Sequence, residues 1–261
     1  MLPILLSLGP VKIYTFSVVL VLAFFLVGYI FWRKGREEHF PEDELFDGYL
    51  LALLVGVVAS RLGFIVFHFG NFGLDAWKWF NLLAYPGIIP LFGLLASFLV
   101  LYRFAQRQKW DAFEFLDFAA IAAAFGFALI WLGLFLDGTS FGNATSLPWG
   151  MSFPLVFDKH HPTQLYGLIS YALLFVYLYW VESRYRTFEW YRDKRHSAQT
   201  GFLFCVFCMM YGAVGVVMGF LMPPQLMVFG VALDIPVRIL LFMYGFILLF
   251  VRAGRSFRPV K

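Results

Sequence analysis

Long apolar runs recur along this 261-residue chain and constrain its fold more than any other feature. They fall near residues 12–32, 46–69, 83–102, 116–137, 163–181, 200–221 and 226–251. Each run is close to the ~20 residues that a helix needs to cross ~30 Å of hydrocarbon. Strands of a membrane barrel are shorter and alternate apolar with polar residues, which these runs do not. The runs predict an all-α, polytopic membrane protein of about seven transmembrane helices.

The composition excludes a water-soluble globule of this size. Hydrophobic residues make up 61% of the chain and charged residues only 14%, and there are 34 phenylalanines. Such a chain cannot cover a globule with polar side chains, whereas lipid accepts an apolar exterior. We therefore expect residues 1–261 to form a single membrane domain. The net charge of +4 is explained by loop residues near anionic head groups, and no nucleic acid is expected as a partner.

Basic residues gather in the loops on one side of the predicted bundle. The positive-inside rule places that side in the cytoplasm, with the N-terminus outside and the C-terminus cytoplasmic. The residues 33–45 on this side are expected to form a solvated connection. The cations of the predicted cytoplasmic side are Arg33, Lys34, Arg36, Arg103, Arg107, Lys109, Arg184, Arg186, Arg192, Lys194, Arg195, Arg252, Arg255, Arg258 and Lys261, whereas the opposite side holds Lys12, Lys78 and Lys159.

Charged side chains at membrane depth are costly, so each is a candidate site residue. Arg61 lies well inside the second run, and its planar guanidinium suits a phosphate or a carboxylate. A structural ion pair or snorkelling toward the interface is the alternative for Arg61. Asp234 and Arg238 are four residues apart and share a helix face, which predicts either a local ion pair or a substrate contact. Asp137 ends the fourth run, beside a loop of small and polar residues.

Residues 160–166 place two imidazoles, an amide and a phenol directly before the fifth run. Either His160 or His161 could accept a proton, because imidazole titrates near neutrality. A proline at position 162 suits the first helical turn, from which Gln164 and Tyr166 can point toward a cavity. Helix capping and interface anchoring are the structural alternative for these residues.

No metal or cofactor is expected. His39, His68 and His196 fall in other loops or faces than the His160–His161 pair. Cys205 and Cys208 form a C-x-x-C in the middle of an apolar run, where a metal site would need two more ligands. A redox role would need an accessible thiolate, so we expect both cysteines to be packing residues.

The string from His161 to Tyr166 closely resembles the His-Pro-(Thr/Ser)-Gln-Leu-Tyr signature of bacterial prolipoprotein diacylglyceryl transferases. Further stretches resemble family motifs in the same order, namely Ser7–Pro10, Ser60–Phe64, Gly142–Phe153 and Tyr211–Ala213. The resemblance implies seven helices with the N-terminus outside. It also implies a multi-pass location in the bacterial cytoplasmic (inner) membrane.

The resemblance implies transfer of a diacylglyceryl group from phosphatidylglycerol to the lipobox cysteine of a prolipoprotein. A thioether forms and glycerol phosphate leaves, so the reaction needs a base for the thiol and cations for the phosphate. The expected partners are the phospholipid and the lipobox segment. The expected roles are His161 as base, with Arg61, Gln164, Tyr166, Asp137 and Arg238 in substrate binding.

Several family positions are substituted in this chain, mostly from charged to apolar. The imidazole of the family's His-Gly-Gly would fall at Leu91, and a phosphate-binding arginine at Trp131. Its helix-six Arg and Glu fall at Gly215 and Gly219, and the acid after the signature tyrosine at Gly167. Further departures are at Tyr14, Phe16, Leu134 and His160. The alternative interpretation is therefore a catalytically degenerate family member that binds lipid or lipoprotein. A transporter would need inverted repeats or a charged pathway, which the sequence lacks.

Overall fold

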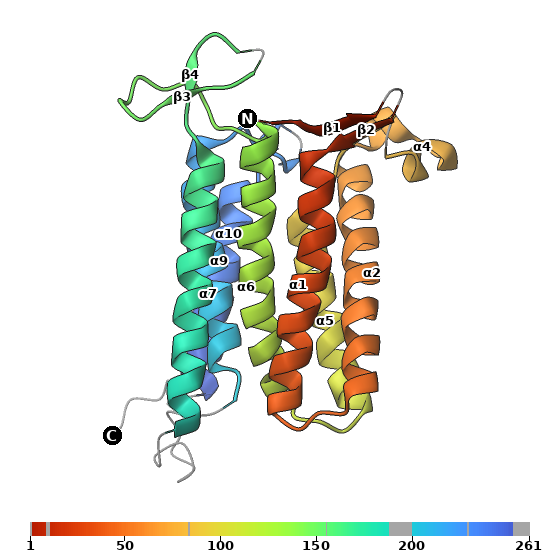
Figure 1. Ribbon diagram of the computed structural model, residues 1–261, viewed down its shortest axis with the longest axis vertical. Coiled ribbons are helices and arrows are strands. Elements are labelled where there is room, and N and C mark those ends of the chain that lie inside the picture. Colours follow the sequence, from red (N-terminus) through yellow and green to blue (C-terminus); the bar gives the residue numbers. More distant parts are fainter. Residues whose placement is uncertain are drawn as a thin grey trace.

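The chain folds as a bundle of long helices with short β-hairpins at one end (Figure 1). The structure is a computed structural model that describes residues 2–8, 11–82, 84–154, 156–187, 200–228 and 230–252. The long helices are α1 (Thr15–Glu37), α2 (Glu42–Phe67), α5 (Pro90–Arg107), α6 (Ala112–Asp137), α7 (Thr163–Thr187), α9 (Phe202–Leu221) and α10 (Asp234–Arg252). The short elements are α3 (Phe69–Phe72), α4 (Ala76–Phe80) and three antiparallel strand pairs, β1 (Ile4–Leu8) with β2 (Val11–Tyr14), β3 (Met151–Ser152) with β4 (Lys159–His160), and β5 (Met227–Val228) with β6 (Val231–Ala232).

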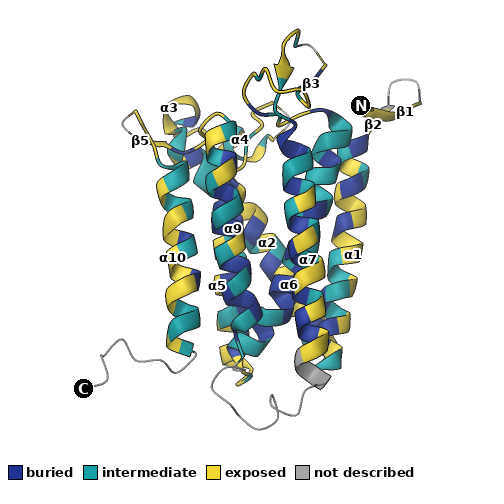
Figure 2. Cartoon of the chain, turned by 90° about the vertical axis from the view of Figure 1, so that its left-hand side faces the viewer, coloured by how far each residue is buried: buried dark blue, intermediate teal, exposed yellow. Residues whose placement is uncertain are grey.

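Within the described ranges, α1, α2, α6, α7, α9 and α10 are long and apolar enough to cross a membrane. Many positions on their outward faces are exposed (Figure 2). Large apolar side chains, such as Phe25 on α1 and Leu173 on α7, are among them. An apolar exterior of this kind is stable in lipid and unstable in water. The prediction of an all-α, polytopic membrane protein is confirmed. The remaining expected span, 83–102, overlaps α5, which is 18 residues long and carries Arg103 and Arg107 toward its end.

Helix boundaries differ from the apolar runs where prolines and glycines intervene. The run 83–102 becomes helical only at Pro90, since proline is tolerated in the first turn of a helix but not within it. The run 226–251 begins with the β5–β6 hairpin, whose turn contains Gly230 at a positive φ of 81°, and α10 starts at Asp234. Pro236 lies in the first turn of α10, so it does not interrupt the helix.

Helix α6 lies in the centre of the bundle. It packs against α1 and α7 on either side and also against α5 and α9, while α2 pairs with α5 and α10 pairs with α9 (Figure 1). Asp111 caps the start of α6, because its carboxylate accepts hydrogen bonds from the backbone N–H groups of Phe113 and Glu114. Gly138, in the left-handed conformation with φ 81°, ends the helix.

Glycines allow α9 and α10 to approach closely. A Cβ at Gly212 of α9 would lie 2.7 Å from the carbonyl oxygen of Arg238, and one at Gly245 of α10 would lie 2.8 Å from the carbonyl oxygen of Cys205. Small residues are the usual means of close helix packing in membranes. This contact fixes the backbone of Arg238 against α9. Both cysteines of the C-x-x-C are buried in the same helix, as expected of packing residues.

The two ends of the bundle carry different connections. The outer end carries the β-hairpins, α3 and α4, and the inner end carries the α1–α2 and α5–α6 connections (Figure 1). The names follow the orientation that the loop charges predict. The residues 33–45 at the inner end are not all solvated as expected, because Lys34 is only 4% exposed and pairs with Glu182 of α7.

Candidate functional site at the outer end

The start of α7 is bound tightly to the loop that follows α6. Thr163 and Gln164 are fully buried. The Thr163 hydroxyl donates to the carbonyl of Ser140 at 2.9 Å, and Gln164 Nε2 donates to the carbonyl of Thr139 at 2.7 Å. Gln164 therefore holds two helix ends together, and its Oε1 is buried without a hydrogen-bond donor among the described residues.

Asp137 joins the same junction from the α6 side. Its Oδ2 accepts a hydrogen bond from the Thr139 hydroxyl at 3.0 Å, while the Thr139 carbonyl accepts from Gln164. Thr139 thus connects Asp137 and Gln164, two residues that the sequence singled out separately. The junction fixes the loop after α6 against the first turn of α7.

His161, Tyr166 and Trp149 form a chain of polar side chains beside this junction. Trp149 Nε1 donates to the Tyr166 hydroxyl at 2.9 Å, and that hydroxyl lies 3.5 Å from His161 Nδ1. A distance of 3.5 Å is at the outer limit of a hydrogen bond. If Nδ1 carries the proton and points to the hydroxyl, Nε2 is the basic nitrogen and is available to a substrate. His161 and Tyr166 are both half-buried, so the set is accessible from the outer end.

His160 has a structural environment. Its Nδ1 lies 2.8 Å from the carbonyl of Gly142, and its ring meets Phe141 edge-on. A carbonyl partner requires a proton on Nδ1, so His160 acts as a donor there. Of the two adjacent histidines, His161 is the one that contacts a titratable hydroxyl.

Arg61 lies in another part of the outer end, on α2, which packs against α5 and α1. All three of its nitrogens donate to backbone carbonyls, Nε to Trp79 at 3.0 Å, Nη1 to Gly87 at 2.8 Å and Nη2 to Lys78 at 2.9 Å. The guanidinium also lies 5.0 Å from the centre of the Phe72 ring. Arg61 thereby holds the α4 region onto α2, and no described contact joins it to His161.

Arg238 and Asp234 do not form the local ion pair that their spacing allowed. The Asp234 carboxylate accepts instead from the backbone N–H groups of Gln225 and Leu226, at 3.0–3.2 Å. The ion-pair interpretation is wrong because two backbone N–H groups of the preceding loop bind this carboxylate instead. Among the described residues, no carboxylate lies within 4.0 Å of Arg238.

The Arg238 side chain lies against α9, within the bundle. Its guanidinium carbon is 5.0 Å from the centre of the Tyr211 ring. A Cβ at Gly215 would lie 2.5 Å from Arg238 Nη1, so the arginine uses the space that the missing side chain leaves. The Nε atom is buried without a hydrogen-bond partner in the described part of the chain. Arg238 is thus a cation at membrane depth without a counter-ion.

A second glycine is matched by a large neighbour in the same way. The indole of Trp131 on α6 lies directly against Gly167 of α7, where any Cβ would overlap its ring atoms. Sequence reasoning identified positions 131, 167, 215 and 238 one at a time and missed this pairing. The sequence contained one clue to this pairing: two family positions are replaced by glycine, Gly167 and Gly215, and each faces a large side chain of another helix, Trp131 and Arg238.

Metal ligands do not gather in the described ranges: no group of three or more His, Cys, Asp or Glu side chains there could hold an ion. The outer end instead offers an imidazole, a phenol and, on the neighbouring helices, a guanidinium without a counter-ion among the described residues. With the fold, these features define a polytopic membrane protein whose candidate site lies at the outer ends of α6 and α7, with Arg238 between α9 and α10 as a further position that no described contact joins to His161.

Comparisons with known proteins identify the family. Residues 3–251 match the family described as prolipoprotein diacylglyceryl transferase, and the chain belongs to that family. A phosphatidylglycerol–prolipoprotein diacylglyceryl transferase of Bordetella avium is 28% identical, covering 98% of this chain and 96% of the relative. One of Legionella pneumophila is 32% identical over 66% of this chain and 69% of the relative. Another, of Wolbachia pipientis, is 30% identical over 66% of each chain.

Proposed function

We propose that this protein transfers the diacylglyceryl group of phosphatidylglycerol to the lipobox cysteine of a prolipoprotein. The match to the family over 3–251 carries the proposal, because it spans the described helices from α1 to α10. The proposed location is the bacterial cytoplasmic membrane, with the outer end facing away from the cytoplasm. Substrates of this kind, a phospholipid and a membrane-inserted precursor, both reach such a site from the lipid.

The reaction requires a base, and we assign this role to His161. Its Nε2 takes the proton of the cysteine thiol, and the thiolate sulfur attacks the glycerol carbon that bears the phosphate. A carbon–sulfur bond forms, the carbon–oxygen bond to phosphate breaks, and glycerol phosphate leaves with the electron pair. Tyr166, held by Trp149, orients the imidazole through its 3.5 Å contact with Nδ1.

The leaving phosphate needs a cation, and Arg238 is the residue best suited to it. A planar guanidinium with no counter-ion in the described residues can form two parallel bonds to a phosphate. An unpaired cation at membrane depth is costly, which favours a ligand as its partner. Arg238 would then supply, from α10, the charge that position 215 on α9 lacks.

We assign Arg61, Gln164 and Asp137 to positioning rather than to direct contact with phosphate. Each already has protein partners, which are backbone carbonyls for Arg61 and Gln164 and the Thr139 hydroxyl for Asp137. Asp137 and Gln164 hold the loop beside His161, and Arg61 holds the α4 region elsewhere at the outer end.

The test is transfer by the purified full-length protein in micelles that contain phosphatidylglycerol and a lipobox peptide. We expect mass spectrometry to detect a peptide heavier by one diacylglyceryl group on its cysteine sulfur. Phosphatidylcholine in place of phosphatidylglycerol, a serine-substituted lipobox and the His161→Ala variant are the controls. Binding of phosphatidylglycerol without product, under conditions in which the Bordetella avium relative is active, would reject transfer and support the lipid-binding alternative.

A further inference from the structure

A groove of about 540 Å³ runs between α1 and α7, with α6 as its floor. It lies in the inner half of the bundle, away from the candidate site at the outer end. Helices α1 and α7 lie on opposite sides of α6 (Figure 1). The groove between them is open to the outside of the bundle. The part nearest the middle of the bundle is apolar and is formed by Leu26, Phe125, Phe175 and Val176.

The part of the groove nearest the inner end is polar and aromatic. Arg33 is the one charged residue among those that line it, and Tyr29, Tyr179 and Trp180 lie beside it. Arg33 Nε donates to Glu37 at 3.2 Å, and its side chain is 51% exposed. The two terminal nitrogens of Arg33 have no partner in the described part of the chain, so they remain available to a ligand.

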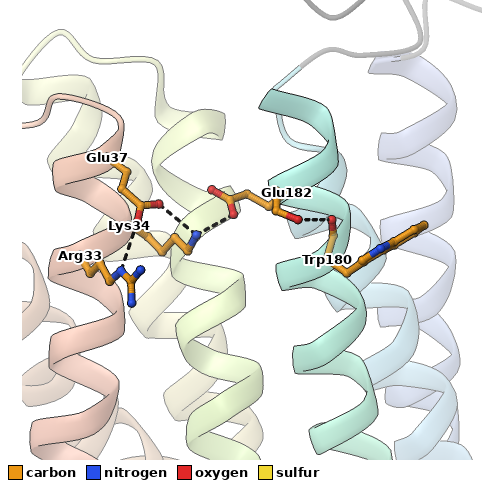
Figure 3. Close-up of polar contacts among 6 residues, drawn as sticks. Arg33, Lys34, Glu37, Trp180 and Glu182 are labelled. Atoms are coloured by element: carbon orange, nitrogen blue, oxygen red, sulfur yellow. Dashed lines mark hydrogen bonds and ion pairs between the residues drawn. The ribbon is translucent and has the colours of Figure 1, made fainter. Parts of the chain in front are cut away.

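A buried ion pair closes the groove at its inner end. Lys34 Nζ of α1 lies 2.6 Å from Glu182 of α7 and 3.0 Å from Glu37 (Figure 3). It also lies 4.1 Å from the centre of the Tyr179 ring. This bridge joins two helices that otherwise pack mainly on α6. Because Lys34 is already satisfied by two carboxylates, Arg33 is the cation that the groove offers to a ligand.

We propose that this groove binds one anionic phospholipid from the inner leaflet. Its polarity changes along the helix axes as a phospholipid does, from apolar near the bundle centre to polar near the inner end, where Arg33 is the charged residue that lines it. An acyl chain lies against Phe125, Phe175 and Val176, and the phosphate accepts from the terminal nitrogens of Arg33. Basic pockets between transmembrane helices on the cytoplasmic side recognise anionic head groups in this way, and aromatic side chains favour the same depth. The site is independent of the proposed transferase function.

Native mass spectrometry of the full-length protein in mild detergent tests the proposal. With phosphatidylserine, an anionic phospholipid that is not the proposed substrate, and phosphatidylcholine at equal concentration, we expect one phosphatidylserine to be retained preferentially. Arg33→Gln should weaken its retention about fivefold, since one cation near the head groups contributes ~1 kcal/mol. Val176→Trp, or Leu26→Trp on the opposite wall, should block the groove and abolish retention at this site. Arg103→Gln, an exposed cation at the same end on α5, is the matched control.

Equal retention of the two lipids would overturn the proposal. So would an Arg33→Gln variant that behaves like Arg103→Gln, or retention that survives both tryptophan variants. Val176 and Leu26 are 60% and 43% exposed toward lipid, so their enlargement leaves the core intact. Unchanged thermal unfolding of the variants confirms this. Transfer activity at the outer end, measured separately, distinguishes failure here from failure of the proposed function.

Discussion

Lys34 and Arg238 are both cations within one helix bundle, but their surroundings differ. Lys34 is 4% exposed and contacts two carboxylates, Glu182 at 2.6 Å and Glu37 at 3.0 Å. Arg238 has no carboxylate within ion-pair distance among the described residues and lies over the Tyr211 ring. A buried charge that joins helices has its counter-ion in the protein, whereas a charge that binds a ligand is left for the ligand to neutralise. If the proposed roles are right, the inner end holds the bundle together and the outer end carries the chemistry.

The largest expected effect is on stability, at the inner end. Lys34→Met leaves the Glu182 carboxylate buried without its cation, which should cost about 3–5 kcal/mol in the free energy of unfolding. Thermal and denaturant unfolding in micelles measures it. The double variant Lys34→Met with Glu182→Leu should recover most of the loss, because no buried charge remains. A Lys34→Met variant as stable as the wild type would show that the Lys34–Glu182 pair does not stabilise the fold.

The next effect is on activity, at the outer end. Arg238→Gln should lower kcat/KM for diacylglyceryl transfer about 100- to 1000-fold, as loss of one donor to a developing negative charge does. Stability should stay the same or rise, because an unpaired cation is removed from the bundle. Transfer assays and unfolding of the same preparation test both parts. Reduced stability with normal transfer would show that Arg238, like Lys34, has a structural role and does not bind the substrate.

A further test moves the guanidinium from position 238 on α10 to position 215 on α9. Gly215→Arg alone should misfold or lose activity, because its Cβ would lie 2.5 Å from Arg238 Nη1. Adding Arg238→Gly frees that space and places one guanidinium on α9 instead of α10. Recovery of transfer above the level of Arg238→Gln is the expected result. No recovery in a folded double variant would tie the function to α10 itself.

A smaller effect is expected where an uncharged pair fills the bundle. Gly167→Val would force the Trp131 indole to move, and overpacking of this kind costs about 1–3 kcal/mol. Unfolding measurements should detect the loss. Adding Trp131→Ala should relieve it, since the ring that the valine meets is then absent. Equal destabilisation in the single and double variants would contradict the assigned packing.

The smallest effect concerns the orientation of His161. Tyr166→Phe removes a hydroxyl that Trp149 and His161 share, and a neutral hydrogen bond contributes about 1 kcal/mol. We expect a loss of about tenfold or less in kcat/KM with little change in stability. Trp149→Phe, which leaves the hydroxyl in contact with His161, should lose less. An effect as large as that of His161→Ala would instead make Tyr166 a direct participant in the reaction.

The membrane fold could be predicted because each helix carries its own signal. A run such as 116–137 is long and apolar whatever surrounds it, and Pro90 and Gly230 explain where two runs fail to become helical from their start. The start of α7 could also be predicted from a local signal, since the residues from Pro162 to Tyr166 are contiguous. These features depend on periodicity and local backbone chemistry, which a single sequence contains.

The long-range contacts could not be predicted, because they join segments far apart in the chain. Lys34 and Glu182 are separated by 148 positions, so the residues 33–45 were interpreted as a solvated connection. Arg61 meets carbonyls 17 to 26 positions away, in a loop whose path no local pattern indicates. The partners of Asp234 were missed as well, because two loop N–H groups and not Arg238 bind its carboxylate. The site residues were found individually, and their partners were found only in the fold.

The fit of Arg238 beside Gly215 has an evolutionary consequence. A guanidinium on α10 and a long side chain at position 215 exclude one another, since both would occupy the same volume. Positions 215 and 238 should therefore covary among relatives, with a small residue at one whenever the other is long. A motif compared column by column reports a lost arginine in such a lineage, although the charge persists on an adjacent helix.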